Sequence, residues 1–107
     1  MKITLYLLKG PYPEYYCGKA KNIGRRIMQH KVGHGSKCTK RWKSFEVIRT
    51  VNLEVKNESE AHFAEASFTR QMRDQLPGMM VYGPGDHMQK GYLPKYRPKK
   101  GGSTYHF

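Results

Sequence analysis

The stretch Tyr16-Cys17-Gly18-Lys19-Ala20-Lys21-Asn22-Ile23-Gly24-Arg25-Arg26-Ile27-Met28-Gln29-His30 joins a short strand to a short helix. Aromatic and apolar residues at its start predict the strand. Asn22 is a favourable helix N-cap, and the residues after it predict a helix over 22–31. At 100° per residue, two isoleucines share one face of that helix with Arg26 and His30. This face is therefore half apolar and half polar.

The flanking segments extend the pattern in both directions. Residues 2–8 alternate loosely between apolar and other side chains and predict a strand. The turn residues at 10–13 join it to the next strand as a β-hairpin. Residues 45–55 are rich in β-branched and apolar side chains and predict a third strand. A capping box at 57–60 begins a longer helix that reaches Leu76.

The predicted fold class is α+β, a small three-stranded and mainly antiparallel sheet flanked by helices. One domain is expected to span residues 1–78, because Pro77-Gly78 ends the second helix. Residues 79–107 form a basic, turn-rich C-terminal extension, in which 79–82 is compatible with a short strand.

The charge balance is strongly positive. The 107 residues include 20 Lys or Arg and 8 Asp or Glu, which gives a formal net charge of +12. From Lys19 to Lys43 there are nine Lys or Arg and no acidic residue. This segregation indicates one positive face, and the usual polyanionic partner of such a face is nucleic acid.

Localisation follows from composition. No apolar run approaches the roughly 20 residues that a membrane-spanning helix needs, and residues 1–8 lack the pattern of a signal peptide. Two cysteines, Cys17 and Cys38, suit a reduced compartment. The sequence therefore predicts a cytoplasmic protein without a membrane partner.

An acidic residue interrupts the apolar stripe of the second predicted helix. Glu65 falls four residues after Ala61 and three before Phe68, so it shares their face. A carboxylate there is costly unless it is paired or binds a metal. Glu65 and Arg26 could form a structural salt bridge, or Glu65 could bind a metal while Arg26 binds a phosphate. The third option is a carboxylate at the edge of the stripe that reaches water or pairs with a lysine.

These segments resemble the GIY-YIG nuclease family, which includes the nuclease half of a bacterial excision-repair incision enzyme and phage homing endonucleases. Thr4-Leu5-Tyr6 is similar to the first family motif and Tyr16-Cys17-Gly18 to the second. The run from Tyr16 to Arg26 and the helix segment 60–65 follow in the family's order. The resemblance covers residues 1 to 76. It departs from the family pattern at Thr4, which replaces a glycine, and at Cys17, which replaces an aliphatic residue.

The resemblance implies a metal-dependent endonuclease that hydrolyses phosphodiester bonds. Its catalytic set consists of polar side chains on the first two strands and both helices: Tyr6, Tyr16, Lys19, Arg26, His30 and Glu65. Glu65 would hold one Mg²⁺ or Mn²⁺, because such hard cations commonly use one or two carboxylates with water completing the shell. Zinc is a minor alternative, since His30, His34 and Cys38 recur at intervals of four but glycines interrupt that segment and no fourth ligand is evident.

The implied roles divide the work of hydrolysis. Tyr6 is the expected general base and Tyr16 its positioning partner. A free tyrosine has a pKa of about 10, so Lys19 or the metal is expected to favour the phenolate. Arg26 would stabilise the transition-state charge, and His30 would contact phosphate or a tyrosine hydroxyl. Considered one at a time, these residues also have purely structural interpretations. The two tyrosines could be ordinary aromatic residues of strands, and Lys19 and His30 could be solvated surface residues.

Cations outside the catalytic set are expected to contact backbone phosphates. They lie on the first helix and its approach, the basic loop and the tail: Lys21, Arg25, Lys37, Lys40, Arg41, Lys43, Lys95, Arg97, Lys99 and Lys100. We expect DNA rather than RNA as the partner, with low intrinsic sequence specificity. A homodimer or a protein partner could supply further specificity. The alternatives are a non-catalytic nucleic-acid-binding module on the same fold and an interaction or inhibitor protein of the phage type.

Overall fold

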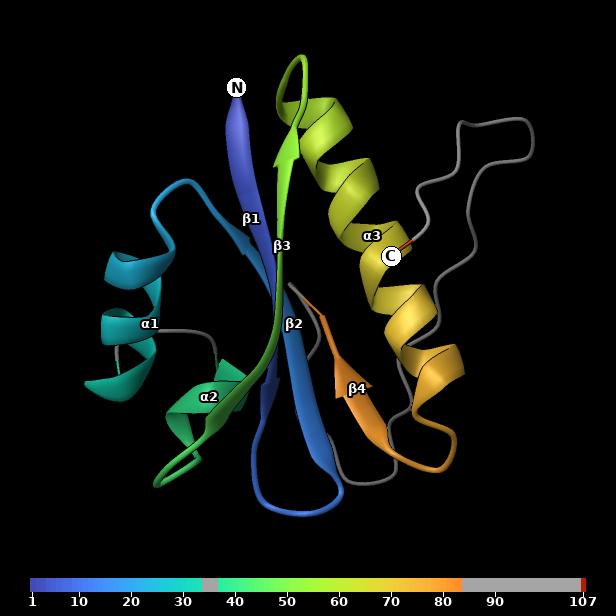
Figure 1. Cartoon of the computed structure of the whole chain (residues 1–107). Helices are drawn as coiled ribbons and strands as arrows, with labels where there is room; N and C mark the ends of the chain where they lie inside the picture. The colour runs from blue at the N-terminus through green and yellow to red at the C-terminus, as the bar shows by residue number, and fades with distance from the viewer. Residues whose placement is uncertain (34–36, 84–106) are drawn as a thin grey trace.

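The computed structural model describes residues 1–33, 37–83 and 107 (Figure 1). The elements follow in the order β1 (Lys2–Lys9), β2 (Glu14–Ala20), α1 (Ile23–Lys31), α2 (Lys37–Lys40), β3 (Glu46–Glu54), α3 (Glu58–Gln75) and β4 (Met80–Tyr82). The α+β class is confirmed. No helix within these ranges is long and apolar enough to cross a membrane.

The sheet has four strands in the order β3-β1-β2-β4. β1 pairs antiparallel with β2 and with β3, whereas β4 pairs in parallel with β2. The prediction of a three-stranded sheet is therefore wrong, and the sheet is mixed. Gly78, with φ of +80°, reverses the chain after α3 and returns it beside β2. β4 confirms the short strand suggested at 79–82, but with only three residues it was too short for a period-2 pattern to place it in the sheet.

The described part of the C-terminal extension contacts the domain core through β4 and through Phe107. Val81 of β4 is fully buried. The ring of Phe107 stands edge-on to that of Phe68, with their centroids 5.4 Å apart. The sheet therefore includes residues after Gly78.

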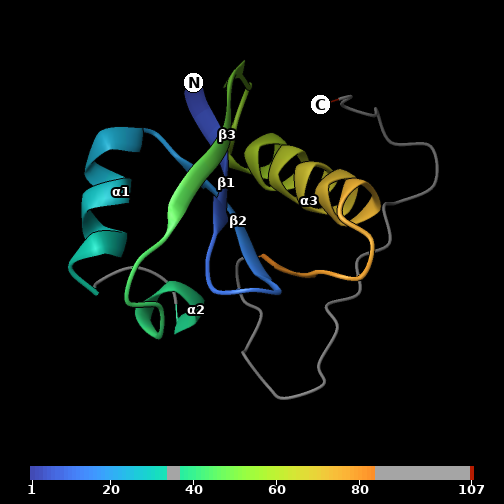
Figure 2. The ribbon, with the colours of Figure 1, turned by 60° about the horizontal axis from the view of Figure 1, so that its bottom comes forward.

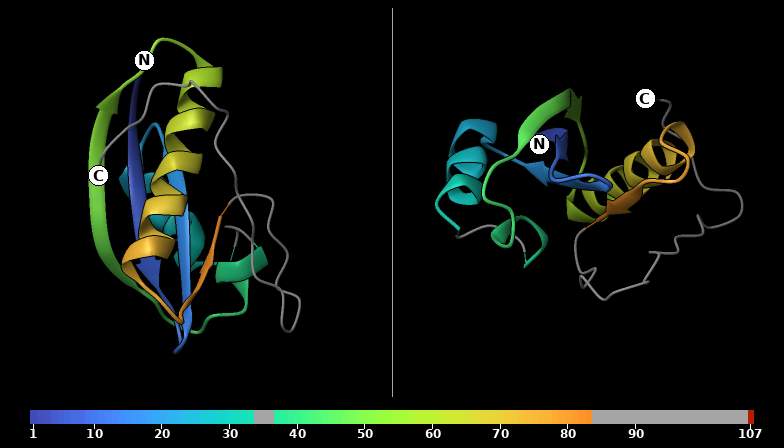
Figure 3. Two further views of the ribbon diagram at one scale, coloured as in Figure 1. Left: turned by 90° about the vertical axis from the view of Figure 1, so that its right-hand side faces the viewer. Right: turned by 90° about the horizontal axis from the view of Figure 1, so that it is seen from below.

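Helices cover the two faces of the sheet. In β1, Ile3, Leu5 and Leu7 belong to the core cluster under α3, whereas Tyr6 and Leu8 belong to a second cluster that α1 and α2 cover. Figure 2 and both views of Figure 3 place α1 and α3 on opposite sides of the strands. Successive residues of β1 therefore enter different cores, and the strand is buried on both faces.

Asparagines fix where the two long helices begin. The Asn22 side-chain oxygen accepts a hydrogen bond from the backbone N–H of Arg25, and that of Asn57 accepts one from Glu60. Each cap satisfies one of the N–H groups left open at a helix start and stabilises the helix by about 1 kcal/mol. Both caps were predicted from the sequence.

One edge of the sheet is only partly covered. β4 pairs with β2 at residues 14–16 alone. Within the described ranges, residues 17–20 of β2 have no strand beside them on that edge. This open half of β2 lies between α1 on one face and α3 on the other (Figure 1), so side chains from both faces can approach each other there.

Candidate active site

The Tyr6 hydroxyl is the centre of a polar network on the α1 face. It lies 2.9 Å from His30 Nε2 and accepts a hydrogen bond from Arg26 Nε at 3.3 Å. Tyr6 is fully buried and pairs across the sheet with Gly18. A Cβ at position 18 would overlap the phenol ring. Glycine is therefore required there by the close approach of Tyr6, not by a special backbone angle.

His30 joins this network from the last turn of α1. Its Nε2 faces Tyr6, and its Nδ1 lies 2.7 Å from Thr39 Oγ1. Burial, reinforced by the charge of Arg26, lowers the pKa of His30 to about 4. The imidazole is therefore neutral at pH 7 and carries a hydrogen on one nitrogen only.

The donors around Tyr6 favour one arrangement of hydrogens. Arg26 has only hydrogens to donate, so the Tyr6 oxygen accepts from it. The Tyr6 proton can then point at His30 Nε2, with the imidazole hydrogen on Nδ1 facing Thr39. This tautomer is inferred from the network. It makes His30 an acceptor for the tyrosine proton.

Both tyrosines of the motifs lie beside Arg26. The ring centroids of Tyr6 and Tyr16 are 6.4 Å apart, and each ring lies 5.7 Å from that of His30. Burial lowers the pKa of Arg26, but hydrogen bonds and charge interactions with both hydroxyls outweigh it, so the pKa is raised. Burial raises the pKa of Tyr6 and Glu65 adds to this rise, while Arg26 opposes it. Tyr6 is therefore protonated at neutral pH.

Glu65 reaches the same region from α3. Its side chain belongs to the buried stripe of that helix and is 5% exposed. Lys19 Nζ lies 3.5 Å from its Oε1. Burial raises the pKa of Glu65, and Lys19 followed by Arg26 oppose the rise. The carboxylate therefore interacts electrostatically with Arg26 although its ion pair is with Lys19.

The expected catalytic side chains thus gather around the middle of β2, next to its open half. Tyr6, Tyr16, Arg26 and His30 come from the α1 face. Lys19 and Glu65 come from the other side of the strand. Arg26, not Lys19, is the cation that contacts the base candidate Tyr6. Gly18 of β2 permits this approach, because the Tyr6 ring fills the space that a side chain would occupy there.

A single hard cation fits this donor set. Glu65 offers one carboxylate at the border between the two faces, and such ions often take one carboxylate with water and phosphate oxygens. Among the described residues there is no group of three or more His, Cys, Asp or Glu side chains that could hold a metal. For the zinc alternative, His30 already has a partner at each ring nitrogen, whereas His34 and the Cys38 side chain lie outside the description.

Thr39 is the site residue that the sequence did not reveal. It is 1% exposed and holds His30 Nδ1. It lies in α2, within the segment expected to be a basic loop, where a threonine gives no sign of burial. Phe45 was likewise missed: its ring stands edge-on to His30 at 6.1 Å.

The expected phosphate contacts are distributed around the site. Lys21, Arg25, Lys40, Arg41 and Lys43 are exposed. Lys21 pairs with Glu58 at 3.4 Å, and Arg41 pairs with Glu14. The remaining members of this set lie outside the described side chains: Lys37, Lys95, Arg97, Lys99 and Lys100.

Buried side chains with shifted pKa values, gathered around one hydroxyl, are typical of catalytic sites. The class of protein indicated by the fold and these residues is a small α+β catalytic domain. The chain belongs to the GIY-YIG catalytic domain family, whose model matches residues 2–76. This family consists of nucleases. Comparisons with curated proteins and with solved structures gave no match.

Proposed function

We propose that this chain is a metal-dependent endonuclease that hydrolyses phosphodiester bonds in DNA. The observation that carries the proposal is the Tyr6 hydroxyl, held between neutral His30 and Arg26 and influenced by the charge of Glu65. Membership of a nuclease family supports the same reaction. The formal charge of +12 suits a polyanionic substrate.

The chain's own groups account for the movement of the proton. In one concerted step the attacking water gives a proton to the Tyr6 oxygen while Tyr6 gives its own hydroxyl proton to His30 Nε2, which later releases it to solvent. A separate phenolate does not form, because the pKa of Tyr6 is raised and the pKa of His30 is lowered to about 4. The water oxygen bonds to phosphorus as the bond to the leaving oxygen breaks, and the departing alkoxide is protonated from solvent. Arg26 stabilises the negative charge that develops on the Tyr6 oxygen during this transfer and then faces the phosphate charge.

Glu65 is the residue that would hold the metal. A bound Mg²⁺ or Mn²⁺ neutralises phosphate charge and lowers the pKa of water. Lys19 keeps the Glu65 carboxylate paired while no cation is bound, which offsets the cost of burying it. Tyr16 contributes through its position beside Tyr6 and Arg26.

The second candidate is a nucleic-acid-binding module without catalysis. The ion pair between Lys19 and Glu65 favours it, because the pair occupies the carboxylate that a metal would need. Such a module would bind nucleic acid with a steep dependence on salt and leave it intact.

The decisive experiment compares Glu65→Gln with a matched loss of one charge from the same helix. Asp74→Asn serves as the control, because Asp74 is an exposed acid of α3 outside the site. Each protein is incubated with supercoiled plasmid and Mg²⁺ or Mn²⁺, with and without EDTA. We expect the wild type and Asp74→Asn to cut only with metal, and Glu65→Gln not to cut. Binding without cutting by every protein would support the second candidate, and cutting by Glu65→Gln would refute the proposed metal ligand.

A further inference from the structure

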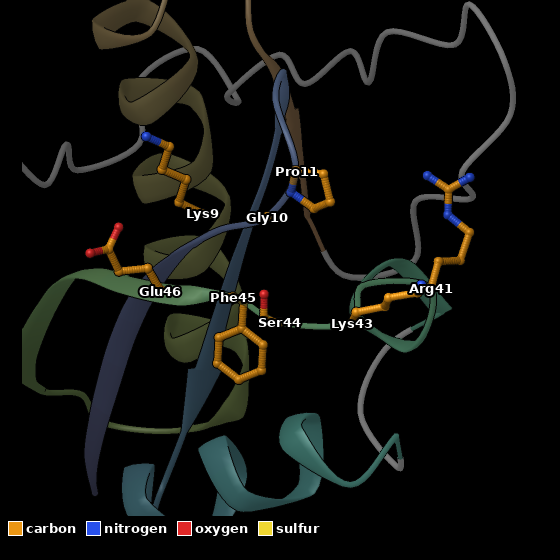
Figure 4. A pocket seen from close by; sticks show the side chains of 8 residues that line it. All are labelled: Lys9, Gly10, Pro11, Arg41, Lys43, Ser44, Phe45 and Glu46. Carbon is orange, nitrogen blue, oxygen red and sulfur yellow. The ribbon is translucent and has the colours of Figure 1, made fainter.

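A hollow lies at the end of the sheet that is lowest in Figure 1, away from the open edge of β2. The turn between β1 and β2 forms one wall, and the segment between α2 and β3 forms the other (Figure 4). Its volume is about 690 Å³. Lys9, Arg41 and Lys43 line it together with one acid, Glu46, so its lining carries a formal charge of 3 − 1 = +2. Neutral surface comes from Gly10, Pro11, Ser44 and Phe45.

This hollow adjoins the candidate active site. A smaller depression of about 260 Å³ is lined by His30, Lys31 and Trp42 and shares the segment 43–45 with the larger one. Phe45 also stands edge-on to His30 at 6.1 Å. A strand that crosses the catalytic tyrosine can therefore continue over this segment into the larger hollow.

The walls of the hollow are fixed to each other. The Glu14 carboxylate accepts a hydrogen bond from Trp42 Nε1 at 2.7 Å and pairs with Arg41 through its other oxygen. Trp42 is 7% exposed and packs against Gly10, where a Cβ would overlap the indole ring. These contacts tie the β1–β2 turn to the segment after α2. The hollow is thus a preformed feature, as ligand sites usually are.

The residues that line the hollow are suited to binding one nucleotide. Lysine and arginine side chains bind phosphate, and the neutral surface with its phenylalanine accepts an aromatic base. A hollow can receive a base only when that base is unpaired, because a duplex keeps its bases stacked inside. A flat basic surface would be sufficient for contact with a duplex backbone.

We propose that this hollow binds an unpaired nucleotide of the substrate strand beside the phosphodiester that is cut. The inference rests on the proposed function, since it assumes that the strand crosses the Tyr6 site. It defines the substrate class as nucleic acid with an unpaired segment next to the cleavage position, such as a flap, bulge or single strand. None of the predicted catalytic residues except His30 lies at either depression.

Binding can be measured without cleavage on the Glu65→Gln background. Two fluorescent DNAs of equal length are compared, one a perfect duplex and one with an unpaired segment. The pocket variant is Lys9→Ala with Lys43→Ala, two exposed lysines that line the hollow. Lys56→Ala is the control, because this exposed lysine follows β3 at the opposite end of the sheet. The single tryptophan, Trp42, lines the smaller depression and packs against Gly10 of the larger hollow, so its fluorescence serves as an additional measure of binding at this end of the sheet.

We expect the pocket variant to lose roughly tenfold more affinity for the DNA with the unpaired segment than for the duplex. Lys56→Ala should affect both DNAs alike. A second variant, Ser44→Phe, fills the space without removing a charge. It should abolish the preference for the unpaired segment and leave duplex affinity unchanged, which separates base exclusion from loss of charge.

Equal losses on both DNAs in the pocket variant, or an unchanged preference in Ser44→Phe, would overturn the proposal. The experiment also distinguishes a failure of the proposed nuclease activity from a failure of the proposed nucleotide site. A protein that never cuts but shows the pocket-dependent preference would refute the nuclease and keep the nucleotide site. A protein that cuts both DNAs equally, with no effect of the pocket variants, would keep the nuclease and remove the site.

Discussion

Acidification tests whether His30 is neutral in the folded protein. Burial lowers its pKa to about 4, with the Arg26 charge as the second cause, whereas the ordinary value is 6.5. Between these values the unfolded chain binds a proton that the folded chain does not. The free energy of unfolding should therefore fall as the pH falls from about 6.5 to about 4, and His30 should have no effect on it above that window.

The size of the effect follows from the two pKa values. Their difference, 6.5 − 4 = 2.5 units, corresponds to about 3 kcal/mol when the window is crossed completely. At pH 4.5 the same pKa values give a loss of about 2–3 kcal/mol. This is a large part of the stability of a small domain, which is typically about 5–15 kcal/mol. Glu65 acts in the opposite direction, because its raised pKa favours proton binding in the folded state as the pH falls.

A comparison of variants isolates the contribution of His30. His30→Gln keeps a donor and an acceptor but cannot take the charge, and Glu65 remains the same in both proteins. His62→Gln is the control, because His62 is an exposed histidine of α3. Urea unfolding is followed by circular dichroism from pH 7.5 to 4.5. The wild type and His62→Gln should lose about 2–3 kcal/mol more than His30→Gln does over this range.

Parallel pH dependence in the wild type and His30→Gln would refute this reasoning. It would mean that His30 is already protonated in the folded state or is accessible to water. Protonated His30 has no lone pair to accept the Tyr6 proton, so the proposed proton path would fail as well.

Three further predictions concern the network around Tyr6. Tyr6→Phe removes the hydroxyl that His30 and Arg26 contact, and cleavage should fall by at least roughly 10²-fold while circular dichroism shows a folded protein; undiminished cleavage would exclude Tyr6 as the base. Gly18→Ala would place a methyl group where the Tyr6 ring lies and should lower the free energy of unfolding by about 1–3 kcal/mol. The Cβ added by Gly24→Ala meets nothing nearer than 3.6 Å, so this variant should raise the free energy of unfolding by up to about 1 kcal/mol. Urea titration of both variants shows whether the two changes in stability have opposite signs. Arg26→Lys keeps the charge but loses the fixed geometry of the guanidinium, and single-turnover cleavage should slow by roughly 10²-fold; an unchanged rate would show that only the charge matters.

Local signals in the sequence were sufficient for most of the fold. Asparagine caps, period-2 strands and the stop at Pro77-Gly78 are properties of neighbouring residues, so they could be recognised without knowing the tertiary structure. The burial of Glu65 was also predictable, because a helix places residues three and four apart on one face. Thr39 could not be found in this way, since its contact with His30 depends on how α2 packs rather than on its neighbours in the chain.

The position of the site and the error in the strand count have the same physical origin. α1 and α3 lie on opposite faces of the sheet (Figure 3), so Arg26 and Glu65 can interact only around an edge, not across a covered strand. β4 pairs with residues 14–16 of β2 and then stops. A longer β4 would show the alternation of apolar and polar residues by which strands are recognised in a sequence. Such a strand would also continue beside residues 17–20 of β2 and occupy the space between the side chains of the α1 face and those of the α3 face. The shortness of β4 therefore explains both why the predicted sheet left it out and why residues 17–20 of β2 are open.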